Sequence, residues 1–204
     1  MDDSSQQSMT LSSRERLVGA AMRLFAEQGF QRTTVGEIEG AAGFTPRGGS
    51  LYKHFPDKES ILEAAVQRHV DRVRTLRKAT DLLPLGHTDA DLTLLLRSLL
   101  VELGDEREIT AVLEKEGPSF PELRDRFYRD LVEPGYREAA ALARRTTATG
   151  DGWDADALAV VVIGALVNLL RNQWTFGATP LDVSVERVVR TVVQLLASVR
   201  GPRR

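Results

Sequence analysis

The stretch from Thr34 to Phe55, TVGEIEGAAGFTPRGGSLYKHF, constrains the fold most, because it predicts two short helices joined by a tight turn. Thr34 precedes Glu37 by three positions, which is the spacing of a capping box at a helix start. The apolar residues that follow at helical spacing are Val35, Ile38 and Ala42. They give the first helix one apolar face. Gly43 is predicted to end it, since glycine is common just past a helix.

A second helix is predicted directly after this turn. Thr45 is a candidate N-cap, and Pro46 fits the first helical position, where its missing N–H costs nothing. Leu51 and Phe55 are four residues apart and are expected to face inward. The residues left mostly outside are Ser50, Tyr52, Lys53 and His54. Two short helices joined in this way form a helix-turn-helix, whose second helix enters the DNA major groove.

The local charge favours DNA as the partner. No Asp or Glu lies between Gly40 and Phe55, and phosphates are bound by cations and hydroxyl donors. Lys58 follows at the start of the next helix, where a helix N-terminus also favours a phosphate. The candidate DNA-binding residues are Thr34, Thr45, Arg47, Gly48, Ser50, Tyr52, Lys53, His54 and Lys58. A helical hairpin with a solvated polar face is the alternative interpretation of the same pattern.

The region from about Arg14 to Glu63 resembles the N-terminal domain of the tetracycline-repressor (TetR) family of bacterial transcription regulators. The residues that carry the resemblance are Ala21, Leu24, Phe25, Gly29, Phe30, Thr33-Thr34-Val35, Ile38, Ala41-Ala42-Gly43, Leu51-Tyr52-Lys53-His54-Phe55, Lys58 and Glu59. Two features depart from the family pattern. Seven residues separate Gly43 from Leu51, which makes the turn or the start of the recognition helix longer than usual. Glu39 stands where the family usually has a small apolar residue, between the poor helix formers Gly36 and Gly40.

Composition is that of a folded soluble protein. The 204 residues are 42% hydrophobic and 27% charged, with a formal net charge of −2. A non-specific DNA coat would need positive charge over its whole surface, whereas a regulator needs only one basic patch. The absence of cysteine excludes disulfides, thiolate metal sites and a cysteine nucleophile. No apolar signal region opens the sequence and no run reaches the about 20 apolar residues of a membrane span, so we expect a cytoplasmic protein.

The whole chain is predicted to be all-α, in three parts. Residues 1–11 are polar and read as a disordered leader. Residues 12–56 form the helix-turn-helix domain, opened by a capping box at Ser12 and Glu15. Residues 57–204 form an effector-binding and dimerisation domain. Its first helix is predicted to start at Asp57 and run to about Ala79, long enough to link the two domains mechanically.

Five further helical segments are expected. Asp89 or Asp91 is predicted to cap a leucine-rich helix that Gly104 interrupts, and a shorter helix follows to Gly117. The next segment spans about 120–147 and should kink or break near Glu133, because Pro134 follows it. Residues 83–88 and 146–152 are predicted connections. Asp154 is expected to begin a long apolar helix, and Thr179-Pro180 is expected to start the last one.

The last two helices carry more apolar surface than one face of a surface helix needs. They lie either at the centre of one chain or also against a second chain, and two from each subunit would form a four-helix, two-fold interface. The resemblance implies the second arrangement, because TetR-type regulators dimerise through their last two long helices. The candidate interface residues are Val161, Ala165, Leu169, Val185, Val188, Val189, Val192 and Leu196.

An effector pocket is implied by the resemblance. The helices from Asp57 to about Thr147 should enclose a small, mainly apolar ligand. Candidate lining residues are Leu96, Leu99, Leu103, Leu113, Phe120, Phe127, Asn168 and Trp174. Each fits ordinary core packing better than ligand contact, and the polar residues among them also suit a dimer interface.

The first function hypothesis is a dimeric, ligand-responsive DNA-binding regulator, most simply a repressor released from a pseudo-palindromic operator by a small effector. No cofactor is expected. The second is an enzyme with a vestigial helix-turn-helix. It is disfavoured because His54, His69 and His87 have no metal-ligand spacing and Gly48-Gly49 lacks the Lys-Ser/Thr of a phosphate loop. A dimeric interaction scaffold is the third, but it leaves the basic helix-turn-helix unexplained.

Overall fold

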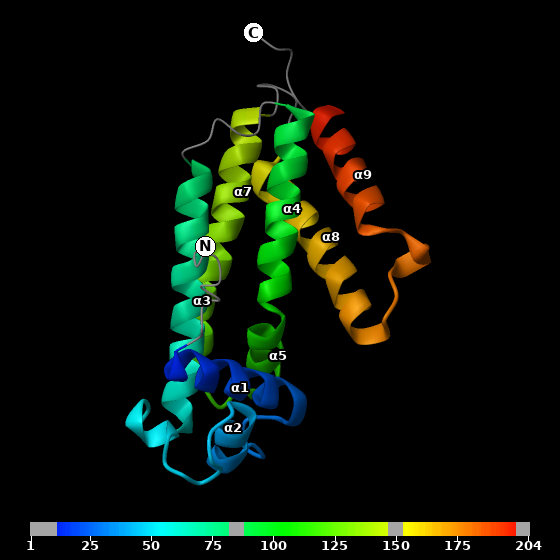
Figure 1. Cartoon of the computed structure of the whole chain (residues 1–204). Helices are drawn as coiled ribbons and strands as arrows, with labels where there is room; N and C mark the ends of the chain where they lie inside the picture. The colour runs from blue at the N-terminus through cyan, green and yellow to red at the C-terminus, as the bar shows by residue number, and fades with distance from the viewer. Residues whose placement is uncertain (1–11, 82–87, 147–152, 199–204) are drawn as a thin grey trace, which may run out of the picture. The chain divides into compact units, whose positions relative to one another are not determined.

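The chain folds into helices joined by turns, as a computed structural model shows for residues 12–81, 88–146 and 153–198 (Figure 1). The elements in order are α1 (Ser13–Gln28), α2 (Val35–Ala41), η1 (Leu51–Lys53), α3 (Lys58–Asp81), α4 (Asp89–Asp105), α5 (Arg107–Glu116), α6 (Pro121–Phe127), η2 (Tyr128–Val132), α7 (Glu133–Thr146), α8 (Ala155–Phe176), η3 (Pro180–Asp182) and α9 (Val185–Ser198). No strand occurs in these ranges, which confirms the predicted all-α class. The expected leader, most of the 83–88 connection and most of the 146–152 loop lie outside the described residues.

The described residues divide into two compact units. The N-terminal unit holds the residues up to His69 together with Glu108–Arg124, and the C-terminal unit holds those of Val70–Arg107 and Asp125–Arg204. This division differs from the expected domain boundary between residues 56 and 57. The reason is packing: the first half of α3, most of α5 and the start of α6 bury their apolar side chains with the helix-turn-helix.

The core of the N-terminal unit collects side chains from several elements. From α1 it takes Leu17, Val18, Ala20, Ala21, Met22 and Phe25, and from α3 it takes Ile61, Leu62, Ala65 and Val66, all at most 3% exposed. Ile38 on α2 and Leu51 on η1 are fully buried between them. Each short element therefore has one apolar anchor in a core that it could not form alone.

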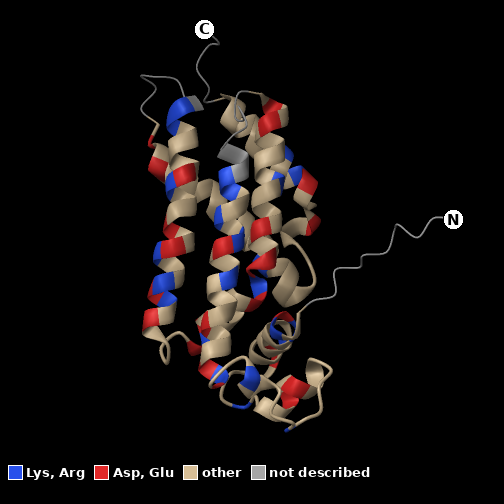
Figure 2. Ribbon diagram, turned by 60° about the vertical axis from the view of Figure 1, so that its left-hand side comes forward, with Lys and Arg blue, Asp and Glu red and all other residues tan. Residues whose placement is uncertain are grey.

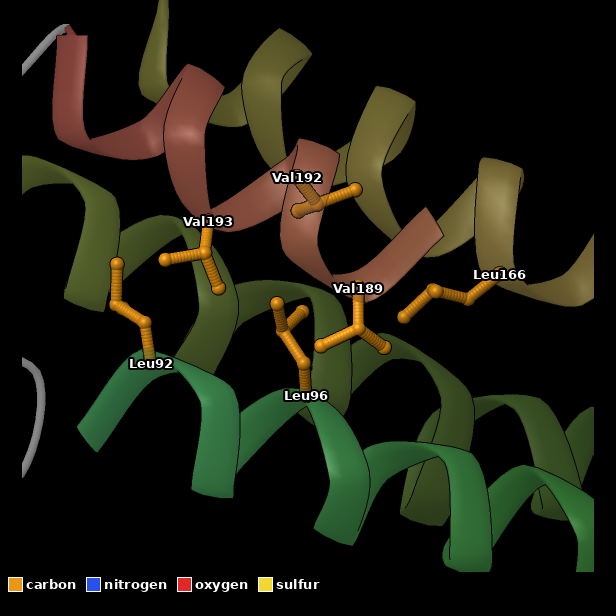
Figure 3. Close-up of a cluster of buried hydrophobic side chains, with 6 residues drawn as sticks. All are labelled: Leu92, Leu96, Leu166, Val189, Val192 and Val193. Atoms are coloured by element: carbon orange, nitrogen blue, oxygen red, sulfur yellow. The ribbon is translucent and has the colours of Figure 1, made fainter. Parts of the chain in front are cut away.

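The C-terminal unit is built around two helix pairs, with α7 packed on α8 and α9 packed on α4. Figure 3 shows the cluster where α4, α8 and α9 meet, with Val193 beside Leu92 and Val189 beside Leu96. Leu166 of α8 completes the contact, and it is fully buried. This cluster accounts for one apolar face of α9, which is used within the chain.

Arg77 of α3 joins three helices of the same unit. Its guanidinium forms an ion pair with Glu102 of α4 and lies 3.5 Å from Glu138 of α7. It also donates a hydrogen bond of 3.2 Å to the carbonyl of Leu131. The side chains of Arg77 and Glu102 are only 15% and 13% exposed, so the pair is shielded from most solvent screening.

The predicted break near Glu133 is confirmed, and it takes the form of a π-helical turn. η2 covers Tyr128–Val132 and gives way to α7 at Glu133. Pro134 has no N–H to continue an α-helical ladder from α6, and π-turns are a common cause of such irregularities.

Two predicted helix starts are corrected. Thr88, rather than Asp89 or Asp91, is the N-cap of α4, and Asp91 is its reciprocal partner in a capping box. The last helix begins at Val185, not at Thr179-Pro180. Pro180–Asp182 forms a single 3₁₀ turn, and Leu181 and Asp182 have φ of 56° and 50°, which breaks the helix.

The helix α8 begins as predicted, capped by Asp154, and ends at the left-handed Gly177. By length and composition it is apolar enough to cross a membrane, a property that helices of soluble protein interiors share. Among its exposed side chains are Val160 and Val161, at 57% and 66%.

Candidate DNA-binding interface

The capping boxes fix the start of the first two helices of the N-terminal unit. The Ser12 hydroxyl accepts the N–H of Glu15 at 3.2 Å, and Glu15 accepts the N–H of Ser12 at 2.8 Å. The same reciprocal pair joins Thr34 and Glu37, at 3.3 and 2.7 Å. Both predictions are confirmed, and together they satisfy N–H groups that a helix start leaves without partners.

The segment after α2 differs from the prediction. Gly43 follows the helix at φ 75°, as expected, but no α-helix starts at Thr45-Pro46. Residues 44–50 form a turn closed by a hydrogen bond of 3.0 Å from the Gly48 N–H to the Thr45 carbonyl. The only helical part that remains is η1, Leu51–Lys53. Arg47 and Gly49 have φ of 60° and 75°, and a right-handed helix cannot pass through such residues.

The turn and η1 present their polar residues outward while two apolar residues hold them in place. Leu51 and Phe55 are buried as predicted, at 0% and 3% exposure. The candidate DNA-binding residues that are exposed are Thr34, Thr45, Arg47, Gly48, Tyr52, Lys53 and His54, whereas Ser50 is half-buried. Tyr52 is 61% exposed although it is aromatic. Apart from Thr34, these exposed residues lie in one continuous segment, 45–54, whose polar side chains are available to a ligand.

Lys58 has partners within the protein. Its ammonium donates hydrogen bonds to the carbonyls of Phe30 and Thr33, at 2.6 and 2.8 Å, and lies 4.2 Å from the centre of the Phe30 ring. Burial lowers the pKa of Lys58, against the opposing effect of the Glu116 carboxylate. A phosphate contact by Lys58 stays a prediction, and the structure gives the amine a second role in fixing the 30–33 corner.

Residues at the end of α5 and just after it also pack in the N-terminal unit, which the sequence did not predict. Glu116 accepts the N–H of Phe30 at 3.0 Å, and Lys115 donates to the Ala26 carbonyl at 2.7 Å. Phe120 packs edge-on against Phe30, with 4.8 Å between ring centres. Phe30 is thus the contact point between the helix-turn-helix and a segment more than eighty positions later in the chain.

Charge on the described residues is mixed rather than segregated. Acidic and basic positions alternate along the helices (Figure 2), in line with the net charge of −2. The exception is the stretch from Gly40 to Phe55, which has cations and contains no acidic residue. Glu39, just before this stretch, is buried and adds no acid to the surface. A localised phosphate-binding segment fits this distribution.

Glu39 is the functional candidate that the sequence prediction missed. It is fully buried, and one carboxylate oxygen accepts the N–H of Leu51 at 2.9 Å. The available signal was its position: Val35, Ile38, Glu39 and Ala42 share one face of α2. A charged residue on that face needs a buried hydrogen-bond donor, and the donor here lies twelve positions away.

The predicted effector-pocket residues are divided between the two units. Leu113 and Phe120 belong to the N-terminal unit, and the others belong to the C-terminal unit. Leu96 is part of the α4–α8–α9 cluster, and Leu99 and Leu103 pack against it. Phe127 is buried at 7%, Asn168 is exposed and Trp174 is half-buried. The effector site stays a prediction.

The predicted dimer residues fall into two groups. Val161 and Ala165 are exposed on α8, whereas Leu169, Val189 and Val192 are at most 7% exposed within one chain. Val185, Val188 and Leu196 are half-buried against the same cluster. The buried members have little surface left for a partner.

The described residues are all helical, with a cation-bearing turn after α2, and comparison with family models identifies the class of protein. Residues 17–65 match the model of bacterial regulatory proteins of the tetR family, and residues 84–193 match the tetracyclin repressor-like C-terminal domain. The second match alone covers more than half of the chain. The chain therefore belongs to the tetR family of bacterial regulatory proteins, which confirms the resemblance read from the sequence.

Individual relatives match the sequence of this chain over different lengths. The HTH-type transcriptional repressor BepR of Brucella suis is 28% identical over 203 residues, covering 93% of this chain and 92% of BepR. The repressor KstR2 of Rhodococcus jostii is 43% identical over 58 residues, which is 28% of each chain. Across four such curated relatives the match spans 19% to 30% of the relative's length.

A solved structure extends the agreement to the whole fold. A protein from Mesorhizobium loti, described as a TetR-family transcriptional regulator, has a TM-score of 0.67 at 23% identity. The superposition covers 93% of this chain and 97% of that one. At this identity the likeness concerns the fold alone.

Proposed function

We propose that this protein is a dimeric transcriptional repressor that binds a pseudo-palindromic operator and is released by a small, mainly apolar effector. The observation that carries the proposal is the exposed segment from Thr45 to His54. It is free of acidic side chains and held by the buried Leu51 and Phe55. Membership of the tetR family and the full-length match to a repressor, BepR, support the same function.

Base reading is assigned to the turn and η1. Arg47 offers the planar guanidinium that suits guanine edges, and Lys53 offers a point charge for a phosphate. Tyr52, Thr45 and Ser50 supply hydroxyl donors to the backbone. With so few side chains, one unit gives limited specificity. Two units about one helical turn, roughly 34 Å, apart double the contacts and fix the site's symmetry.

Dimerisation is assigned to α8 and α9. Val160, Val161 and Leu195 are 57%, 66% and 62% exposed, and exposed apolar side chains in this number on adjacent helices favour a protein partner. A second copy supplies a self-complementary surface by two-fold symmetry. Such a dimer acts in the cytoplasm, where its operator is, and requires no catalytic step or cofactor.

Release of the operator by an effector depends on the distance between the two DNA-binding units of the dimer. An effector that binds the form with wrongly spaced DNA-binding units about 100-fold better shifts the equilibrium by about 2.7 kcal/mol, enough to free the operator. In this account the effector occupies the C-terminal unit, whose helices are apolar inside.

The test uses duplexes selected from a random pool by the wild-type protein. Arg47→Ala and Lys53→Ala should each raise the dissociation constant of the selected duplex by about tenfold or more, and each should leave the dimer intact. Lys53→Ala should also reduce the salt dependence, since one phosphate contact is lost. Lys78→Ala removes an exposed cation of α3 in the C-terminal unit and is the matched control. Unchanged binding by both variants would refute these contact assignments.

A further inference from the structure

Glu39 holds both ends of the turn that precedes η1. Its main-chain carbonyl accepts the N–H of Phe44 at 2.8 Å, and its side-chain carboxylate accepts the N–H of Leu51 at 2.9 Å. The seven residues between Gly43 and Leu51 are therefore closed into a loop by one residue of α2. Ser50, the N-cap position of η1, forms no side-chain cap hydrogen bond, so Glu39 supplies the acceptor instead.

The glycines beside Glu39 let the loop approach α2. A Cβ atom at Gly36 would lie 3.1 Å from Cγ of Arg47, and one at Gly40 would lie 3.4 Å from Cγ of Pro46. A larger residue at Gly36 would require the Arg47 side chain to shift by a few tenths of an ångström. Gly36 and Glu39 of α2 therefore both lie against this loop, which is longer than the family pattern.

The loop itself is closely determined. Arg47 and Gly49 take left-handed φ values of 60° and 75°. A Cβ atom at Gly48 would lie 2.9 Å from the Thr45 carbonyl oxygen, so only glycine fits there. Arg47 stands exposed at the tip, in a conformation that a non-glycine residue rarely adopts without support. Its direction is set by the two ends that Glu39 fixes.

The second carboxylate oxygen of Glu39, Oε2, is buried and has no hydrogen-bond partner in the part of the chain that the structure describes. Burying a polar oxygen without a hydrogen-bond partner costs stability. A small apolar residue at this position would avoid that cost but would leave the N–H of Leu51 without an acceptor. The hydrogen bond to the N–H of Leu51 is therefore the contact that this glutamate provides and a small apolar residue would not.

We propose that Glu39 is a positioning residue for operator recognition: by closing the 44–50 loop at both ends it sets the direction of Arg47 and thereby the sequence that is read. This inference rests on the proposed DNA-binding function and adds a specificity-determining residue to it. The longer turn and the unusual glutamate therefore act together, and Glu39 acts without touching DNA itself.

The experiment compares Glu39→Ala, Glu39→Gln and the control Glu63→Ala, which removes an exposed acid of α3. For each full-length variant, binding is measured to the wild-type selected duplex, to single-base variants of it and to a random duplex. A double-mutant cycle with Arg47→Ala is run on the selected duplex. Hydrogen exchange of the Leu51 amide is measured by NMR in the same proteins.

Glu39→Ala should weaken binding to the selected duplex by about tenfold or more, because a buried hydrogen bond to a charged acceptor is lost. Affinity for the random duplex should change by less than about twofold, since phosphate contacts dominate it. Glu39→Gln keeps an acceptor oxygen, so its affinity for the selected duplex should lie between those of Glu39→Ala and the wild type. In the Arg47→Ala background the Glu39→Ala effect should shrink, because both act through the same contact.

The proposal is overturned if folded Glu39→Ala discriminates between the single-base variants as wild type does, or if its effect adds fully to that of Arg47→Ala. Should Glu39→Ala fail to fold, Glu39→Gln and the exchange data decide. A Leu51 amide that exchanges as fast in the wild type as an exposed amide contradicts the geometry. If the wild type selects no duplex, the proposed function fails instead, and slow Leu51 exchange that is lost on substitution still establishes the positioning contact.

Discussion

Single carboxylates at helix starts control much of the local structure. The pKa of Glu37 lies below its ordinary value because its carboxylate accepts the N–H of Thr34 and then the Thr34 hydroxyl. Glu15 has a lowered pKa for the same reason, through the N–H and hydroxyl of Ser12. Both groups bind protons more weakly in the folded protein than in the unfolded chain.

The sign of this effect gives a pH prediction. A lowered folded pKa contributes stability above the unfolded value of 4.5, and that stability is lost as the pH falls through the lowered folded value. Glu37→Ala should therefore be less stable than wild type at neutral pH, and the gap should close in acid. Urea unfolding at a series of pH values measures it. A gap that stays constant down to the most acid condition would show that the capping carboxylate is not the cause.

At the scale of elements, several short-range signals were confirmed, whereas the N-caps predicted at Thr45 and at Asp89 or Asp91 were not. Capping boxes, the Gly43 stop and the break before Pro134 depend on residues within four positions, and the structure has them as expected. The helix predicted at Thr45 is absent, because the left-handed residue after Pro46 is fixed by packing on α2 rather than by local propensity. The false start at Pro180 is different, because Leu181 and Asp182 directly after it have left-handed φ values although Leu181 is 93% exposed.

The sequence predicted which residues of the candidate site are exposed, but not the contacts that hold them in place. Tyr52, Lys53 and His54 are exposed where the pattern places them. The partners that hold the segment, Glu39 to Leu51 and Glu116 to Phe30, join positions 12 and 86 residues apart. No periodicity reports contacts at such separations, which is why the part that α5 plays in the N-terminal unit was missed.

Arg77 gives an element-scale prediction in the C-terminal unit. Replacing Arg77 by Met keeps the aliphatic stem but leaves Glu102 without this ion pair and the Leu131 carbonyl without this donor. Breaking one side of a shielded pair should lower the free energy of unfolding by about 2–4 kcal/mol. Arg72→Met, which breaks a more exposed pair with Asp105, is the matched control and should cost about 1 kcal/mol or less. Equal losses in thermal or urea unfolding would contradict this ranking.

At the scale of the whole molecule, the proposed operator binding requires two copies of the chain. Val161 is 66% exposed on α8 and lies on the proposed interface, so Val161→Glu should produce a folded monomer with weakened operator binding. The control is Leu76→Glu, which introduces the same charge at a half-exposed apolar position of α3. Light scattering and circular dichroism separate dissociation from unfolding. A Val161→Glu protein that remains dimeric and binds normally would move the interface elsewhere.

The most direct measurement is a nuclease footprint of the wild-type protein on the duplex that it selects from a random pool. We expect two protected half-sites related by a pseudo-dyad, with centres about one helical turn apart, occupied by one dimer and released as salt rises. A single unsymmetrical footprint from a monomer, or no selected duplex at all, would contradict a dimeric operator-binding repressor.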